Sequence, residues 1–478
     1  MGSLKKNFIY QTLYQILVVI LPLITAPYIA RVLGADNSGI YSYSHTIANY
    51  FVVFGMLGLE QYGNRCIAKV RDDRDETNRV FSELLLLHII VSAAAAALYF
   101  VYCFTFAAEY RFIFLLQGFY AVSVLFDVNW FFFGIEKFRL TVTRNTVIKL
   151  LTVAAMFIFV RSRDDLWIYT FILSFSMLLS QIAVWPSLRK YVRFVRVPPG
   201  SLKKHLKPLL LLFAAVIAAN LNRMIDKAML GWFGRITDLG CYDYADRIVR
   251  IPLSFIAAIG TVMLSKMSNL TARGDNDGTR KILDVSACLV LMVSFGMGFG
   301  IAAVAPEMTV WFLGDEYAET AVLLSVLAVS IPIVGWNNFI RTQILIPKEM
   351  DMIYTRAVTA GAAVNIVINC FLIYFFGARG ASVATVVSYA VIMLIQTIPI
   401  AGQIKGTFGY TVFPVFAGAV MYAAVRSSSM LTDALFPSVI IELVVGIVVY
   451  GSLCFAYLKI RQPHVLRAIF RKKHPGSS

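Results

Sequence analysis

Long apolar stretches recur along the whole chain, and short polar segments separate them. Each stretch is about 20 residues long, which as an α-helix covers the hydrocarbon thickness of a bilayer. This pattern predicts fourteen membrane-spanning helices. They are expected near residues 8–31, 38–59, 82–104, 112–134, 145–161, 166–187, 208–233, 249–267, 286–305, 320–340, 356–376, 380–402, 409–428 and 438–458.

The composition agrees with this pattern. Hydrophobic residues occupy 59% of the 478 positions and charged residues 15%, whereas soluble proteins carry roughly 25% charged residues. The mean hydropathy of +0.73 excludes a soluble globular protein. Because fourteen spans leave only short connections, the sequence predicts an all-α polytopic membrane protein without a sizeable extramembrane domain.

The distribution of Lys and Arg predicts which ends of the helices face the cytoplasm, because short cytoplasmic loops are enriched in positive charge. Of the 43 such residues, 31 fall on the side of the two termini, nine fall on the opposite side and three lie inside spans. We therefore expect both termini in the cytoplasm. The net charge of +16 then belongs mainly to loops that lie against anionic lipid headgroups, and it does not indicate nucleic-acid binding.

The six cysteines occur singly, without a C-x-x-C pair and without a histidine at metal-ligand spacing. This arrangement supports neither a zinc site nor a disulfide framework. The sequence therefore predicts no metal site and no cofactor.

A short internal repeat relates the two halves of the chain. A segment with Gly39, Tyr41, Tyr43 and Ile47 follows the first span, and a matching segment follows the seventh span at a constant offset of 201. The matching residues are Gly240, Tyr242, Tyr244 and Ile248. Chance similarity between two aromatic-rich loops is the alternative explanation.

The repeat predicts two six-helix lobes followed by two extra helices. Since six is even, both lobes enter the membrane from the same side, and an axis along the membrane normal relates them. We expect the lobes at residues 1–200 and 201–405, and the extra helices with a basic cytoplasmic tail at 406–478. Two parallel lobes with a V-shaped cleft between them are typical of alternating-access transporters.

The seventh predicted span carries the densest group of polar residues inside the membrane. A charge at bilayer depth is costly, so it usually faces a partner or a water-filled cavity. Helical spacing places the charged members on one face. The functional interpretation is a cationic site for a phosphate or carboxylate, and the alternative is a structural ion pair. The group consists of Asn220, Asn222, Arg223, Asp226 and Lys227.

Arg31, Arg247 and Arg250 are expected at the outer end of the cleft, where they would form a second cationic layer. Snorkelling to the membrane surface is the alternative. Tyr41, Tyr43, Tyr242 and Tyr244 would line the mouth of the cleft for contact with sugar, unless they form an interfacial aromatic belt.

Several other titratable residues fall in or at the ends of spans. A buried carboxylate or histidine can carry protons in coupled transport, although solvation at a helix end or a partner Arg is the commoner explanation. The candidates for ion coupling are Glu83, His88, Asp127 and Asp226, and Glu60 and Glu442 occupy similar positions.

Four segments of the chain form a recognisable series of motifs. They are P-Y-I-A-R-V-L-G-A-D-N-S-G-I-Y-S at 27–42, G-L-E-Q-Y-G-N-R-C-I-A at 58–68, W-F-F-F-G-I-E-K-F at 130–138 and N-L-N-R-M-I-D-K-A-M-L-G at 220–231. In this order they resemble the Wzx-type polysaccharide repeat-unit flippases of the multidrug/oligosaccharidyl-lipid/polysaccharide exporter superfamily. The resemblance implies movement of undecaprenyl-pyrophosphate-linked oligosaccharide to the outer leaflet of a bacterial plasma membrane. It also implies a cationic central cavity, for which Arg31, Arg223 and Lys227 are the matching residues, and a polysaccharide polymerase and glycosyltransferases as partners.

Three other functions are compatible with the same architecture. A multidrug-cation extruder would need an anionic cavity, whereas the deep cluster here is net cationic. A lipid II flippase would share the fourteen helices. A membrane glycosyltransferase or polymerase generally needs a long outer loop with acid and base residues, and the outer connections here are short.

Overall fold

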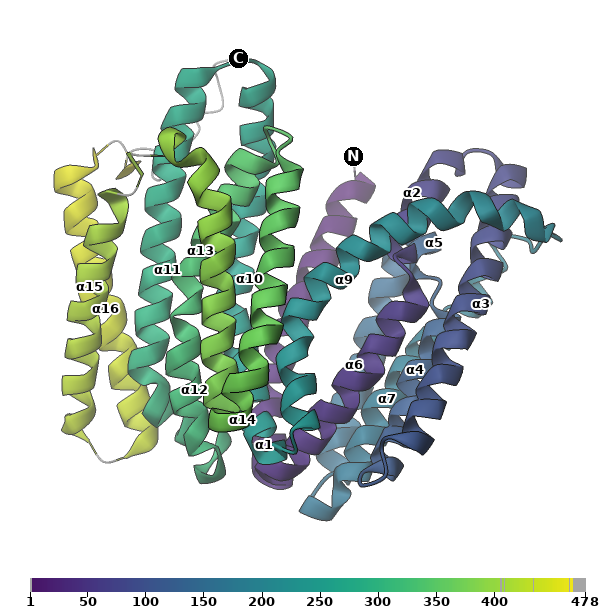
Figure 1. Ribbon diagram of the computed structural model, residues 1–478, viewed down its shortest axis with the longest axis horizontal. Coiled ribbons are helices and arrows are strands. Elements are labelled where there is room, and N and C mark those ends of the chain that lie inside the picture. The colour runs from purple at the N-terminus through teal and green to yellow at the C-terminus, as the bar shows by residue number, and fades with distance from the viewer. Residues whose placement is uncertain (1, 405, 408, 433, 464, 467–478) are drawn as a thin grey trace. The chain divides into compact units, whose positions relative to one another are not determined.

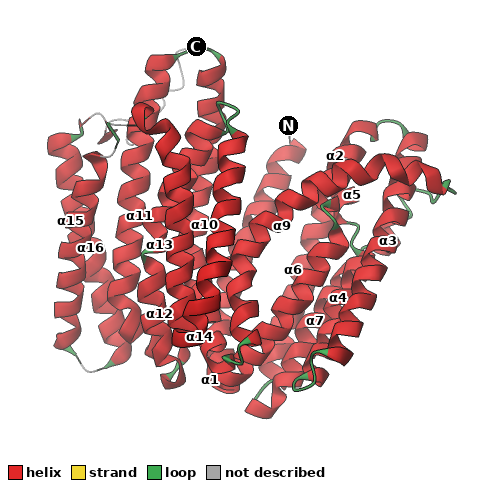
Figure 2. Cartoon of the chain, in the orientation of Figure 1, coloured by secondary structure: helices red, strands yellow, loops and turns green. Residues whose placement is uncertain are grey.

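The computed structural model describes residues 2–404, 406–407, 409–432, 434–463 and 465–466, and the side chains at 2–19, 138, 199, 214–216 and 218–223 also lie outside this description. Within it the chain consists of helices and short connections, with no strand (Figure 2). Nine helical segments of the described residues are long and apolar enough to cross a membrane. The all-α, multi-pass prediction is therefore confirmed, and the count of fourteen spans stays a prediction.

The chain forms two compact units, residues 1–240 and 241–478. The first unit therefore includes the seventh predicted span, which the repeat assigns to the second lobe. The lobe boundaries at 200 and 405 stay predictions. The helices of the first unit are α1 (Gly2–Met56), α2 (Leu59–Val70), α3 (Arg74–Thr105), α4 (Arg111–Ser123), α5 (Asn129–Gly134), α6 (Phe138–Phe159), α7 (Leu166–Ile182), α8 (Trp185–Leu188) and α9 (Lys203–Trp232).

Helix α10 (Ile236–Ala272) begins in the first unit and continues into the second. In the second unit α11 packs against α12, α13, α15 and α16, and α15 and α16 lie side by side (Figure 1). The remaining helices are α11 (Asn276–Leu313), α12 (Ala318–Ala328), α13 (Ser330–Ile340), α14 (Asp351–Thr397), α15 (Gly409–Ser428) and α16 (Leu435–Arg461).

Glycines, rather than loops, separate two pairs of predicted spans. Gly34 interrupts α1 with φ 76° and ψ 174°, between the first and second spans. Gly377 interrupts α14 with φ 55° and ψ −133°, between the eleventh and twelfth. Glycine adopts a positive φ without the steric cost that a Cβ imposes. The two sharp bends therefore depend on the residue type at these positions.

Aspartates start the third helix of each predicted lobe. Asp73 caps α3 by accepting hydrogen bonds from the backbone N–H groups of Asp75 and Glu76, at 2.9 and 3.1 Å. Asp275 caps α11 by accepting from the N–H of Gly278 at 2.8 Å. Such caps satisfy the first N–H groups of a helix, which have no partner within it. The two caps agree with the predicted repeat.

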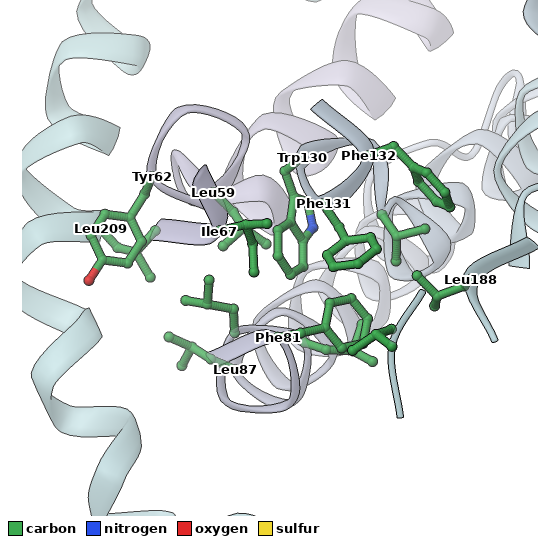
Figure 3. Close-up of a cluster of buried hydrophobic side chains, with 14 of the residues drawn as sticks. Leu59, Tyr62, Ile67, Phe81, Leu87, Trp130, Phe131, Phe132, Leu188 and Leu209 are labelled. Carbon is green, nitrogen blue, oxygen red and sulfur yellow. The ribbon is translucent and has the colours of Figure 1, made fainter. Parts of the chain in front are cut away.

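A cluster of buried aromatic and aliphatic side chains forms a core in the first unit (Figure 3). The short helix α2 places its apolar face on α5, where the ring of Trp130 is fully buried. The Trp130 ring stacks on Phe81 of α3 with centroids 5.5 Å apart. Gly63 of α2 lies beneath this ring, because a Cβ at that position would be 2.6 Å from Trp130 Cε3. The core therefore fixes α2 and α5 against α3.

Candidate functional site

The predicted cationic cluster lies on α9, which packs against α1 and α2. The side chains of Asn220, Asn222 and Arg223 lie outside the described residues. Of the other two members, Asp226 is 2% exposed and Lys227 is half-buried. Protein atoms therefore cover Asp226 almost fully and Lys227 in part.

A strip of polar and aromatic side chains on α1 lies beside this part of α9. Tyr41, His45 and Asn49 follow one another at four-residue spacing, so they share one face of the helix. The His45 ring stacks on Tyr120 of α4 with centroids 4.9 Å apart, and the Tyr120 hydroxyl donates to Asn49 Oδ1 at 2.9 Å. Asn49 Nδ2 lies 3.3 Å from the sulfur of Met224 on α9. The strip thus connects α4 to the turn of α9 that carries Asp226 and Lys227.

The three arginines predicted for a second cationic layer have different surroundings. Arg31 lies in α1 three residues before the bend at Gly34, and its side chain is exposed. In the second unit, Arg247 Nη2 lies 2.7 Å from Asp243 Oδ2, and Arg250 Nε lies 3.0 Å from Asp246 Oδ2. Carboxylates one turn earlier on α10 therefore compensate both of these charges.

The four tyrosines of the repeat are packed inside their units. Tyr41, Tyr43, Tyr242 and Tyr244 are 7%, 8%, 3% and 5% exposed. Tyr43 packs directly on Gly231 of α9, and Tyr244 packs edge-on against Tyr317 with centroids 5.1 Å apart. Their main role in this conformation is therefore packing.

Glu83 of α3 lies at the centre of an ion-pair network. Its side chain is fully buried. Glu83 Oε2 lies 2.7 Å from Lys204 Nζ and accepts a hydrogen bond from His205 Nε2 at 3.0 Å. Glu83 Oε1 lies 3.4 Å from Arg79 Nε, one turn earlier on α3. The network therefore fixes the first turn of α9 to α3.

The hydrogen bonds continue from His205 to Tyr62 of α2. Burial raises the pKa of Tyr62 to about 12, so this phenol keeps its proton at neutral pH. The hydroxyl and His205 Nδ1 are 2.9 Å apart. In a neutral imidazole whose Nε2 donates to Glu83, Nδ1 is the acceptor and Tyr62 the donor. The chain Tyr62–His205–Glu83 is therefore a directed path of hydrogen bonds among α2, α9 and α3.

His88 is also buried, and it is hydrogen-bonded to a break in the fourth predicted span. The helix there changes from α4 to a 3₁₀ turn at Val124–Phe126 before α5 begins. His88 Nε2 donates to the carbonyl of Val124 at 2.7 Å, and the described residues offer no hydrogen-bond partner for Nδ1. The carbonyl of Val124 also accepts from the backbone N–H of Asp127 at 3.1 Å. His88 is therefore a second donor to this carbonyl, and it joins α3 to the 3₁₀ turn.

Asp127 follows this 3₁₀ turn and belongs to a second polar network. Asp127 Oδ1 accepts from the backbone N–H of Asn129 at 2.9 Å, and Oδ2 accepts from Gln181 of α7 at 3.1 Å. Arg144 of α6 donates through Nη2 to Asn129 Oδ1 at 3.0 Å. The network joins α5, α6 and α7 through carboxylate, amide and guanidinium groups, which can also hydrogen-bond sugar hydroxyls.

Sequence reasoning did not single out Tyr62, Arg144, Lys204 and His205 as site residues. Arg144, Lys204 and His205 lie in segments assigned to loops or loop edges, and their partners are distant in the sequence. Tyr62 had a usable signal, because Leu59, Tyr62 and Ile67 recur at helical spacing and indicate an amphipathic helix.

Comparisons with known proteins give a consistent set of relatives. A family model described as "Polysaccharide biosynthesis protein" matches residues 4–270. The chain is 22% identical over 397 residues to the "Putative O-antigen transporter" of Shigella dysenteriae, covering 82% of this chain and 98% of that protein. It is 22% identical over 389 residues to the protein of the same name in Escherichia coli (strain K12), covering 80% of this chain and 92% of that one.

Among solved structures, the chain is similar to "Lipid II flippase MurJ, inward closed conformation", with a TM-score of 0.75. The similarity covers 95% of this chain and 99% of that one at 15% sequence identity. The two chains therefore share a fold.

Proposed function

The chain belongs to the polysaccharide biosynthesis protein family, and on this basis we propose that it flips oligosaccharide repeat units linked to undecaprenyl pyrophosphate across a bacterial plasma membrane. The observation that carries the proposal is the match to two proteins named as O-antigen transporters over nearly their full length. The chain is a transporter rather than an enzyme. Its lipid-linked product would pass to a polysaccharide polymerase, after glycosyltransferases have assembled the substrate.

The physical task is to move the sugar and diphosphate through hydrocarbon. Their polar groups lose water there, so the protein must supply replacement hydrogen bonds and counter-charges. We propose Arg31, Arg223 and Lys227 for the diphosphate, because guanidinium groups bind phosphate oxygens through paired donors. Arg247 and Arg250 would join them when their carboxylate partners release them, and Asn220 and Asn222 would bind neighbouring oxygens.

Ion coupling is the second part of the proposal. Asp226, Glu83, His88 and Asp127 are the candidates, and burial within a predicted span supports Asp226, Glu83 and His88. The path Tyr62–His205–Glu83 gives Glu83 a hydrogen-bonded route for a proton. Movement would occur by alternating access, with both termini in the cytoplasm because of the 31-to-9 distribution of Lys and Arg.

Transport in proteoliposomes tests the proposal. A fluorescent undecaprenyl-pyrophosphate oligosaccharide is placed in the membrane, and its access to an impermeant quencher outside reports flipping. We expect the purified protein to accelerate flipping, and Arg223→Gln to reduce it. Movement of lipid II or of a lipophilic cation, with no movement of the oligosaccharide lipid, would instead support one of the alternatives.

A further inference from the structure

The two C-terminal helices border a cavity within the second unit. Its volume is about 700 Å³, and α10, α11, α15 and α16 contribute its lining. The lining is almost entirely apolar and includes Phe255, Met292, Met421 and Ile447. Among the lining residues, Glu442 of α16 is the one that carries a carboxyl group.

The Glu442 side chain is buried, and few polar groups contact its carboxyl. The residue is 0% exposed. The hydroxyl of Ser438, one turn earlier, donates to Glu442 Oε1 at 3.1 Å. Among the described residues, Glu442 Oε2 has no hydrogen-bond partner. A carboxylate in this position would carry its charge next to an apolar cavity with one hydroxyl as its donor.

The neighbouring charged side chains, Arg426 and Glu307, form an ion pair with each other. Arg426 of α15 places Nη1 at 2.6 Å from Glu307 Oε2 of α11, and it also donates to the carbonyl of Ala303 at 3.3 Å. The other titratable side chains that line this cavity or the neighbouring one are the phenols of Tyr450 and Tyr422. The lining residues from α10 are Ile251, Pro252 and Phe255, which do not titrate.

We propose that the Glu442 carboxyl is a proton-binding site. In the protonated form Oε1 is the carbonyl oxygen that accepts from Ser438, and Oε2 is the hydroxyl. Binding transfers a proton from water to Oε2, and release returns it to water and leaves a carboxylate. An isolated charge removed from water costs several kcal/mol, which neutralisation avoids. The Arg426 and Glu307 side chains of the adjacent pair are 34% and 18% exposed, so this pair reaches the surface of the chain.

Infrared spectroscopy of the purified protein in lipid nanodiscs tests this site directly. We expect a C=O stretching band of a protonated carboxyl that changes with pH and shifts in heavy water. Glu442→Gln removes this band. Ser438→Ala keeps it but moves it to higher frequency, because the hydrogen bond to the carbonyl oxygen is lost.

Glu319→Gln is the matched control, since Glu319 is paired with Arg379 at the surface of the same unit. This variant retains the band. An unchanged band in Glu442→Gln would overturn the proposal, and so would an unshifted band in Ser438→Ala. The Ser438 variant retains the carboxyl, so it decides the question even if Glu442→Gln does not fold.

A role for this proton in transport rests on the proposed function. With a pH gradient across proteoliposomes, the ratio of oligosaccharide-lipid flipping with and without the gradient should exceed one for the wild type and fall to one for Glu442→Gln. Absence of flipping by the wild type would contradict the proposed function and leave the infrared result standing. A ratio above one in Glu442→Gln would show that the proton site is not the coupling site.

Discussion

Gly39 of α1 and Gly240 of α10 contact each other's helices in a reciprocal way. A Cβ on Gly39 would collide with the carbonyl oxygen of Ile236, and a Cβ on Gly240 would collide with the carbonyl oxygen of Ala35. Residues 35 and 236 have the same sequence offset as 39 and 240. The internal repeat is therefore also a local two-fold relationship within the first unit, and both glycines are needed for the backbones to approach this closely.

Gly39→Ala and Gly240→Ala should each destabilise the protein, by about 1–3 kcal/mol, because the added methyl group meets backbone that must move. The change appears as a lower midpoint of thermal unfolding in detergent, followed by fluorescence-detected size exclusion. Gly402→Ala is the control, since its Cβ would meet nothing within 4 Å. Equal midpoints for all three variants would contradict the close approach.

Glu83→Ala should destabilise the protein far more than Arg79→Ala. Removing the buried carboxylate deprives Lys204 of its ion-pair partner and the buried His205 of its hydrogen-bond acceptor. This should cost about 1–3 kcal/mol, mainly for the unsatisfied His205 donor, because Lys204 is 51% exposed. Arg79 is 64% exposed and 3.4 Å away, so its loss should cost well under 1 kcal/mol. Thermal unfolding measures both. If Glu83→Ala unfolds like the wild type but no longer transports, coupling rather than stability is its role.

Gly63→Ala and Phe81→Ala should disturb the aromatic core in opposite ways. The first adds a methyl group under the Trp130 ring, and the second leaves a cavity beside it, at costs of about 1–3 and 3–5 kcal/mol. Tryptophan fluorescence should report both, together with the unfolding midpoint. Phe104→Ala, at a position 59% exposed, is the control. A larger effect of Phe104→Ala than of Phe81→Ala would contradict the assigned core.

Asp243→Asn and Arg247→Gln should change the affinity for a diphosphate lipid in opposite directions if this part of α10 binds substrate. The first releases Arg247 from its partner and adds one positive charge, so binding should tighten a few-fold. The second removes a positive charge and should weaken it by a similar factor. Binding to purified protein at two salt concentrations measures this. If both variants bind the diphosphate lipid more weakly than the wild type, the Asp243–Arg247 ion pair has a structural role.

Impermeant thiol reagents in intact cells test the topology. In a cysteine-free background, a cysteine at exposed Asp164 should react from outside, because it lies between the fifth and sixth predicted spans. A cysteine at exposed Arg196 should react only after the membrane is permeabilised. The reverse pattern would place both termini outside the cytoplasm.

The sequence predicted the spans well because a membrane helix leaves a long, local signal. Gly34 and Gly377 fall in the gaps between predicted spans, and α3, α11 and α16 cover the spans expected there. Helix α6 ends two residues before the end of its predicted span. The break at Val124–Phe126 was missed because the hydropathy stays high across it. Helix α2 was missed because it is too short to span and its periodicity lies in a segment read as a loop.

The polar networks were harder to predict, because their members are distant in the sequence. Glu83 was identified as a buried carboxylate, but nothing local indicated that His205 would be its partner. Likewise, Asp243 and Asp246 lie four residues before Arg247 and Arg250, and this spacing is a usable signal for the ion pairs that form there.

The distance in sequence between Glu83 and His205 has a consequence for synthesis of the protein. The two residues are separated by 122 positions. At about 5–20 residues per second, the ribosome needs on the order of ten seconds to add that length of chain. During this interval α3 holds a carboxylate whose partners on α9 have not yet been made, so the nascent first unit must rely on Arg79, lipid headgroups or the insertion machinery. The first unit can complete its fold only after the ribosome has entered the second copy of the repeat.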